Sequence, residues 1–93
     1  MLSYNRDHLD WVVRNIKKRI NAPYMMANED LADDIFPYLK MEFPDAIMVK
    51  IGIEQWITVT KRGQNALIRL LKSRRTEYEK SINEVKSAID RLI

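Results

Sequence analysis

Few side chains in this sequence could do chemistry, and most of those are carboxylates. Four acids lie within six residues, at Glu29, Asp30, Asp33 and Asp34, and such a cluster could hold a metal ion. The single histidine, His8, is far away in the sequence, there is no cysteine, and the spacing is not that of a calcium loop. Acids at the start of a helix are also favoured by the helix dipole alone. We therefore expect a helix start here and no metal site.

Catalysis is not expected either. The chain has no cysteine nucleophile, no glycine-rich phosphate loop and no spaced pair of carboxylates in a recognisable arrangement. His8 lies near the start of the first predicted helix, where a surface or capping role is expected. The sequence therefore predicts a protein that is not an enzyme, with no catalytic residue and no cofactor.

Positive charge is concentrated in the second half of the chain. Residues 1–45 hold 6 Lys/Arg and 8 Asp/Glu, a net charge of −2, whereas residues 46–93 hold 10 and 5, a net charge of +5. Six of these cations follow one another with no acid among them: Lys61, Arg62, Arg69, Lys72, Arg74 and Arg75. A phosphate backbone would be attracted to this stretch first. The alternative is an ordinary solvated helix face.

Three helices are expected in the first half of the chain. Apolar residues from Leu9 to Ile20 recur at helical spacing and predict a helix over about residues 7–20. Asn28 can cap a second helix, over 28–36. Pro37 disfavours a helical conformation at Phe36 and suits the first turn of a new helix, so a third, short helix is predicted over 37–43.

One β-hairpin follows, over about residues 46–60. Apolar residues alternate with others from Ile47 to Ile53, a turn is expected at 52–55, and the return strand over 56–60 is rich in β-branched residues. Between the first two helices, residues 24–26 are apolar and could form one small strand or a packed linker. The fold class is therefore mainly α with one hairpin, in a body of residues 1–62.

Residues 63–93 contain good helix formers and, after Gly63, neither proline nor glycine, so they are expected to form one helix on the order of 45 Å long. Apolar residues recur in alternating steps of three and four, as in a coiled coil, with Arg75 as the one exception. The residues expected to mediate dimerisation are Ile68, Leu71, Tyr78, Ile82, Val85, Ile89 and Leu92.

Two arrangements could cover this stripe. The helix could fold back across its own domain, or it could pair with the helix of a second copy. About 60 preceding residues offer little apolar surface to cover it, which favours the homodimer, in a parallel or an antiparallel orientation that the sequence does not decide.

Residues 57–71 read Ile-Thr-Val-Thr-Lys-Arg-Gly-Gln-Asn-Ala-Leu-Ile-Arg-Leu-Leu. This segment resembles the end of the wing in winged helix-turn-helix regulators of the PadR and MarR type, and the layout resembles small archaeal and viral winged-helix proteins with a C-terminal coiled coil. Thr60 can cap the turn into the last helix, and Gly63 allows close approach to the strand.

The resemblance implies double-stranded DNA as the partner and residues 37–43 as the recognition helix. The DNA-binding residues that we expect are Tyr38, Lys40, Lys50, Lys61, Arg62 and Arg69. With few cations in the recognition segment, binding should depend largely on phosphate contacts, in a transcriptional regulator or an architectural factor.

The alternative function is a protein-interaction module on the same scaffold. Trp11 falls on the side of the first helix opposite the apolar face, where it is either covered by another element or anchors a protein partner. No segment approaches the roughly 20 apolar residues of a membrane span, and the lack of cysteine suits a reducing compartment. A cytoplasmic protein without membrane contact is therefore expected.

Overall fold

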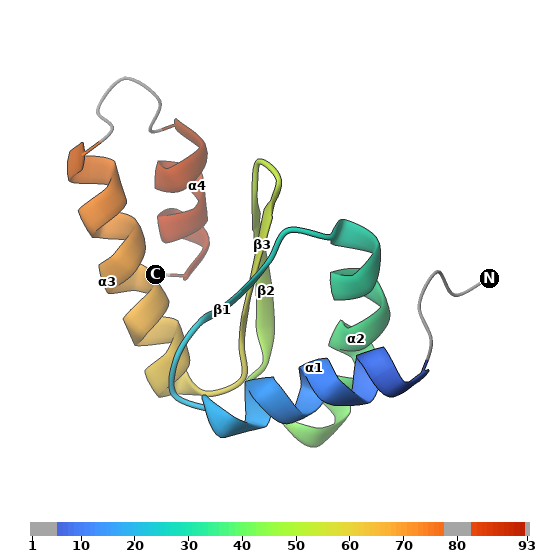
Figure 1. The fold of residues 1–93 in the computed structure, drawn as a ribbon. Coiled ribbons are helices and arrows are strands. Elements are labelled where there is room, and N and C mark those ends of the chain that lie inside the picture. Colours follow the sequence, from blue (N-terminus) through green and yellow to red (C-terminus); the bar gives the residue numbers. More distant parts are fainter. Residues whose placement is uncertain (1–5, 78–82, 93) are drawn as a thin grey trace.

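The computed structural model describes residues 6–77 and 83–92, which form four helices and a three-stranded antiparallel sheet (Figure 1). The elements in chain order are α1 (Arg6–Lys18), β1 (Tyr24–Met26), α2 (Glu29–Glu42), β2 (Ile47–Ile51), β3 (Glu54–Thr58), α3 (Lys61–Glu77) and α4 (Asn83–Leu92). The expected mainly helical chain with a β-hairpin is confirmed as an α+β arrangement.

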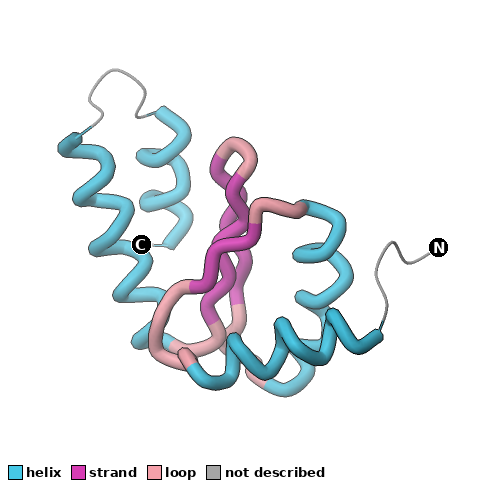
Figure 2. The backbone as a smooth tube through the Cα atoms, viewed as in Figure 1, coloured by secondary structure: helices cyan, strands magenta, loops and turns pink. Residues whose placement is uncertain are grey.

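The sheet lies between two pairs of helices. Its order is β1-β3-β2, so the apolar residues 24–26 form a strand, and β3 lies at the centre. Alternate residues of the sheet face opposite sides: Ile57 packs in the core under α1 and α2, whereas Val49 and Ile51 pack with buried residues of α3 and α4. Figure 2 shows the strands between these two helical layers.

The hairpin turn is shorter than predicted. Ile51 pairs with Glu54, which leaves only Gly52 and Ile53 in the loop. Gly52 has φ of +58°, while no other described residue has a positive φ. A positive φ at the first loop residue alone is the pattern of a type II′ turn, which glycine adopts without strain.

The predicted break at Pro37 is wrong. α2 is one helix of 14 residues that runs through Pro37, with the Asn28 side chain accepting a hydrogen bond from the Leu31 N–H as predicted for its cap. Leu31, Ile35 and Leu39 are all buried on one continuous face. Pro37 has no N–H to bond the carbonyl group of Asp33, one turn earlier. Both residues are exposed, so water can reach that carbonyl group. Burial of the long face outweighs the local preference, and no separate helix over 37–43 exists.

The prediction of one projecting helix over 63–93 is also wrong. α3 begins two residues earlier, at Lys61, and ends at Glu77, and α4 packs back against α3 and against β2. The carboxylate of Glu84, at the start of α4, accepts a hydrogen bond from the Gly52 N–H of the hairpin turn. The C-terminal segment therefore covers its own domain.

The fold-back accounts for most of the predicted dimerisation residues. Leu71, Val85 and Ile89 are buried in the second core cluster, Leu92 packs against that cluster, and Ile68 is half-buried. Tyr78 and Ile82 lie outside the described residues. The apolar stripe thus has a partner within the same chain, namely the face of the sheet formed by Val49 and Ile51.

Candidate nucleic-acid interface

Lys40, predicted to contact DNA from a recognition helix, is engaged within the chain. Its ammonium group donates to the carbonyl oxygens of Pro44, at 2.7 Å, and Ala46, at 3.1 Å. These bonds tie the end of α2 to the segment that leads into β2. Tyr38 lies on the same helix with 65% of its surface exposed. The structure therefore leaves Tyr38 accessible but directs Lys40 toward the backbone.

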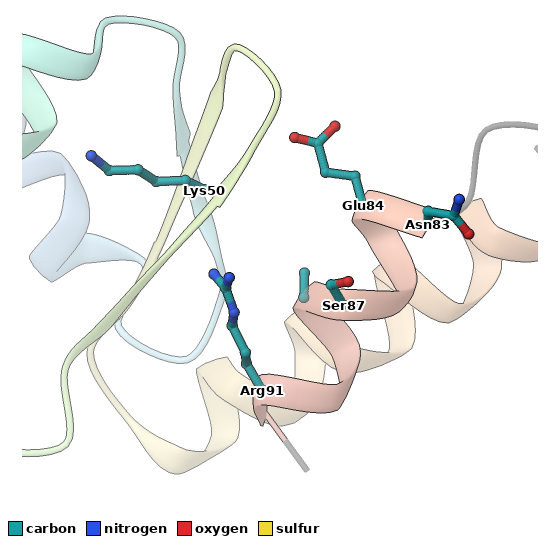
Figure 3. Close-up of a pocket in the computed structure, with 6 residues that line it drawn as sticks. Lys50, Asn83, Glu84, Ser87 and Arg91 are labelled. Carbon is teal, nitrogen blue, oxygen red and sulfur yellow. The ribbon is translucent and has the colours of Figure 1, made fainter.

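Lys50 on β2 is engaged as well, because its ammonium group bridges two acids of α2. It lies 3.0 Å from Glu29 Oε1 and 3.3 Å from Asp33 Oδ1. The hydrogen bond to Glu29, followed by the one to Asp33, raises the pKa of Lys50. Figure 3 shows this side chain extending away from α4. The acidic cluster thus meets a lysine from the sheet, and Lys50 carries no unbalanced positive charge.

Lys61 and Arg62 have a different environment at the start of α3. Both are exposed, and no ion pair is found for either in the part of the chain that the structure describes. The hydroxyl of Thr60 accepts the N–H of Gly63 at 3.0 Å, as expected for a cap. The same hydroxyl lies 3.0 Å from the Ile20 carbonyl oxygen and 3.0 Å from Asn21 Oδ1.

Gly63 allows this junction to be close. A Cβ atom at this position would lie 3.3 Å from Thr58 Cβ, 3.4 Å from Thr60 Oγ1 and 3.5 Å from the Ile20 carbonyl oxygen. The first turn of α3 therefore packs directly on the end of β3 and on the segment that follows α1. Because of this contact, two exposed cations, Lys18 at the end of α1 and Arg19 in the turn after it, belong to the same end of the molecule as Lys61 and Arg62.

The outer side of α3 continues the positive charge. Leu67 and Leu71 are fully buried, whereas Arg69 and Lys72 are exposed on the other side of the helix. Arg62 and Arg69 are seven residues apart, or roughly 10 Å along the axis. We call this surface the basic face; it consists of Lys18, Arg19, Lys61, Arg62, Arg69 and Lys72.

The position of two of these cations opposes the helix dipole. The N-terminus of a helix carries a partial positive charge, so acids there are stabilising and cations are not. The first turn of α3 contains no acid, and it begins with Lys61 and Arg62. α1 and α2, by contrast, both have acids in their first turns. The start of α3 thus departs from the pattern that stability alone favours.

Arg74 belongs to the basic sequence run, but its charge is balanced by an acid of the sheet. Its guanidinium lies 2.6 Å from Glu54 Oε1. Burial on its own would raise the pKa of Glu54, but the hydrogen bonds from Arg74 and from Trp56 outweigh this effect and hold that pKa below its ordinary value. This pair joins α3 to β3 and leaves the basic face to the residues that point outward.

Sequence reasoning identified four of the six residues of the basic face. Lys61, Arg62 and Arg69 were predicted, and Lys72 was recognised as part of the basic run. Lys18 and Arg19 were missed, because their position depends on the contact of Thr60 with Ile20, which are 40 residues apart. Their place on the polar side of α1 was the only sequence feature that pointed to them.

Other parts of the described chain offer less. A pocket between the hairpin and α4 is lined by Lys50, Asn83, Glu84, Ser87, Ala88 and Arg91. Glu84 points toward the hairpin turn and Arg91 rises toward the sheet (Figure 3). No group of three metal-ligating side chains is found in residues 6–77 and 83–92. None of the helices within these residues has the length and apolar character of a membrane span.

Comparison with known protein families, with curated proteins and with solved structures finds no match to this chain.

Proposed function

We propose that this protein binds double-stranded DNA through phosphate contacts made by the basic face. The six cations come from the end of α1, the turn that follows it and α3; they are exposed and have no ion-pair partner among the described residues. Phosphate oxygens are the complementary ligands, and arrays of lysine and arginine supply most of the affinity of proteins for duplex DNA.

The observation that carries the proposal is the placement of Lys61 and Arg62 at the positive end of α3. A cation there reduces stability by roughly 0.3–1 kcal/mol, and no neighbouring carboxylate compensates in the described structure. Residues that break a local rule without a structural gain are expected at functional sites. Because the Thr60 hydroxyl already accepts a hydrogen bond from the Gly63 N–H, the side chains of Lys61 and Arg62 are the groups that would hold a phosphate here.

This mode of binding favours an architectural factor over a sequence-specific regulator. α2 is a single helix, its first turns are acidic, and Lys40 and Lys50 are engaged within the chain. None of the residues in the basic face lies on α2. Phosphate contacts position a protein on DNA but carry no sequence information, so weak sequence preference is expected.

The test is fluorescence anisotropy with a labelled duplex of about 20 base pairs, titrated between 50 and 200 mM salt. With four or five phosphate contacts, the affinity should fall roughly 100- to 500-fold over this range. Lys61→Glu combined with Arg62→Glu should remove most of the binding at every salt concentration.

The matched control is Arg6→Glu combined with Lys86→Glu. It changes the net charge by the same amount, at exposed positions outside the basic face. This variant should retain most of the affinity. Equal losses in both variants would mean that net charge alone attracts the DNA, and an affinity that does not respond to salt would contradict the proposal.

A further inference from the structure

A second surface lies between α1, β1 and the start of α2, where a shallow apolar pocket opens. Its apolar lining includes Trp11, Val12, Tyr24, Met26 and Leu31. Its volume is about 280 Å³, just below the roughly 300–1,000 Å³ typical of small-molecule sites. A pocket of this size suits one large side chain better than a complete ligand.

The large apolar residues of this pocket are incompletely covered. Trp11 is 54% exposed and Met25 is 44% exposed. The Trp11 ring stacks against His8, with ring centroids 6.2 Å apart and an interplanar angle of 20°. No other element of the described chain covers the indole, so of the two roles expected from the sequence, that of a contact residue is the one that fits its exposure.

β1 adds a second recognition element beside the pocket. It is an edge strand that pairs only with β3 within the described residues. The backbone N–H and C=O groups on its other side are available to a further strand, which is how extended peptides join exposed sheet edges. A peptide bound along β1 would place alternate side chains on the side of the sheet where the pocket lies.

The charge around the pocket indicates which peptide would bind. Asp34 is three residues beyond Leu31 and so lies next to it on the surface of α2, and Asp30 is one turn before Asp34. Neither carboxylate has a cation partner in the described structure, unlike Glu29 and Asp33, which face Lys50. On α1, Asp7 lies one turn before Trp11 and Arg14 lies three residues after it, so these two charges balance and the excess of negative charge comes from Asp30 and Asp34. A second copy bound edge to edge would bring these acids together, which disfavours self-pairing.

We infer that the β1 edge binds an extended segment of another protein, with one large apolar side chain in the Trp11 pocket and lysine or arginine residues on either side of it. This surface is separate from the basic face. It uses the first two turns of α1, β1 and the start of α2, whereas the basic face uses the end of α1 with the turn after it and the outer side of α3. The inference therefore does not depend on DNA binding.

The experiment measures fluorescence anisotropy of labelled decapeptides on the full chain. Each peptide has a Phe, Leu or Trp within alternating Val and Thr residues and two Lys at each end. Three control peptides replace the flanking Lys with Glu, the large apolar residue with Ala, or a residue beside it with Pro. The Lys-flanked peptides should bind, and each control peptide should bind about tenfold more weakly.

Protein variants locate the site. Trp11→Ala should weaken the binding at least tenfold, and Asp30→Asn combined with Asp34→Asn about fivefold. The matched control is Tyr38→Ala, which removes another exposed aromatic residue of the same helical layer and should have no effect. Trp11→Ala should leave duplex DNA binding unchanged, and Lys61→Glu combined with Arg62→Glu should leave peptide binding unchanged.

Several results would overturn the inference. No binding by any Lys-flanked peptide, or equal binding to wild type and Trp11→Ala, removes the proposed site. Full tolerance of Pro excludes strand addition. If sedimentation shows a dimer that Trp11→Ala converts to a monomer, the edge is an interface between two copies instead.

Discussion

At the scale of single residues, the start of α3 combines an unfavourable charge with a proposed function. Lys61 and Arg62 lie where the dipole of α3 repels cations, and the Thr60 cap holds the turn in place. If they are retained for binding, removing their charge should improve the fold while it harms the activity. Such an opposition between stability and function is common at binding sites.

The double variant Lys61→Glu, Arg62→Glu is therefore expected to be more stable than the wild type. Two acids in the first turn suit the helix dipole, and the gain should be about 1 kcal/mol at low salt, or roughly 4–8 °C in Tm. Thermal unfolding followed by circular dichroism measures this change. A lower Tm would indicate that the two cations make stabilising contacts, and the argument from the dipole would then fail.

At the scale of elements, α2 shows how a buried face can override a local break. Pro37 lacks an N–H and its ring crowds the preceding turn, which costs about 3 kcal/mol in a helix interior. Leu31 and Ile35 before the proline and Leu39 after it are buried, and their burial keeps the helix continuous. The residue itself is exposed, so its side chain adds little packing.

Pro37→Ala is accordingly expected to stabilise the protein by about 1–3 kcal/mol, because it restores a backbone hydrogen bond and removes the steric conflict. Chemical denaturation with urea gives the free energy of unfolding, and Met41→Ala, at an exposed position on the same helix, is a suitable reference. A decrease in stability would show that the proline shapes α2 in a way that the packing of the helix requires.

Much of this element structure follows from the sequence. The spacing from Leu9 to Ile20 predicted α1, and the alternation from Ile47 onward predicted the hairpin. The Asn28 and Thr60 caps were identified, which located the start of α2 and, to within two residues, that of α3. The continuity of α2 could not be predicted, since a proline acts locally whereas the burial that opposes it depends on the whole core.

The candidate site was only partly predictable for the same reason. A lysine in a sequence does not show whether its charge is balanced, and the partners of Lys40 and Lys50 lie in other elements or in a later loop. The apolar repeat near the end of the chain was detected, but a 3.5-residue repeat indicates only that one side of a helix packs against another element. It does not distinguish a partner helix from the chain's own sheet.

At the scale of the whole molecule, the packing of α4 on the sheet of its own chain holds the second half of the domain together. Ile89 is 2% exposed and packs with Val49, Ile51 and Leu71, all in the same chain. The second core cluster is thus completed by α4. Within the described residues, this second core cluster is therefore covered without a second copy.

Ile89→Ala tests this arrangement. Removal of a buried isoleucine side chain should cost about 2–5 kcal/mol. Because the contacts lie within one chain, the Tm of the wild type and of the variant should not change with protein concentration. Differential scanning calorimetry between about 10 and 500 µM measures both quantities. A Tm that rises with concentration would instead support the pairing of helices between two copies.

If the basic face binds nucleic acid as proposed, the hydroxyl group of Thr60 affects which kind of polymer binds best. It links the segment that follows α1 to the first turn of α3, and Gly63 lets these two segments pack closely. The backbone positions that carry the cations of the two segments are therefore held relative to one another. Such an arrangement suits a rigid polyanion, such as a duplex, whose phosphates repeat at constant intervals. A flexible single strand of equal charge would lose conformational entropy in order to bind in the same way.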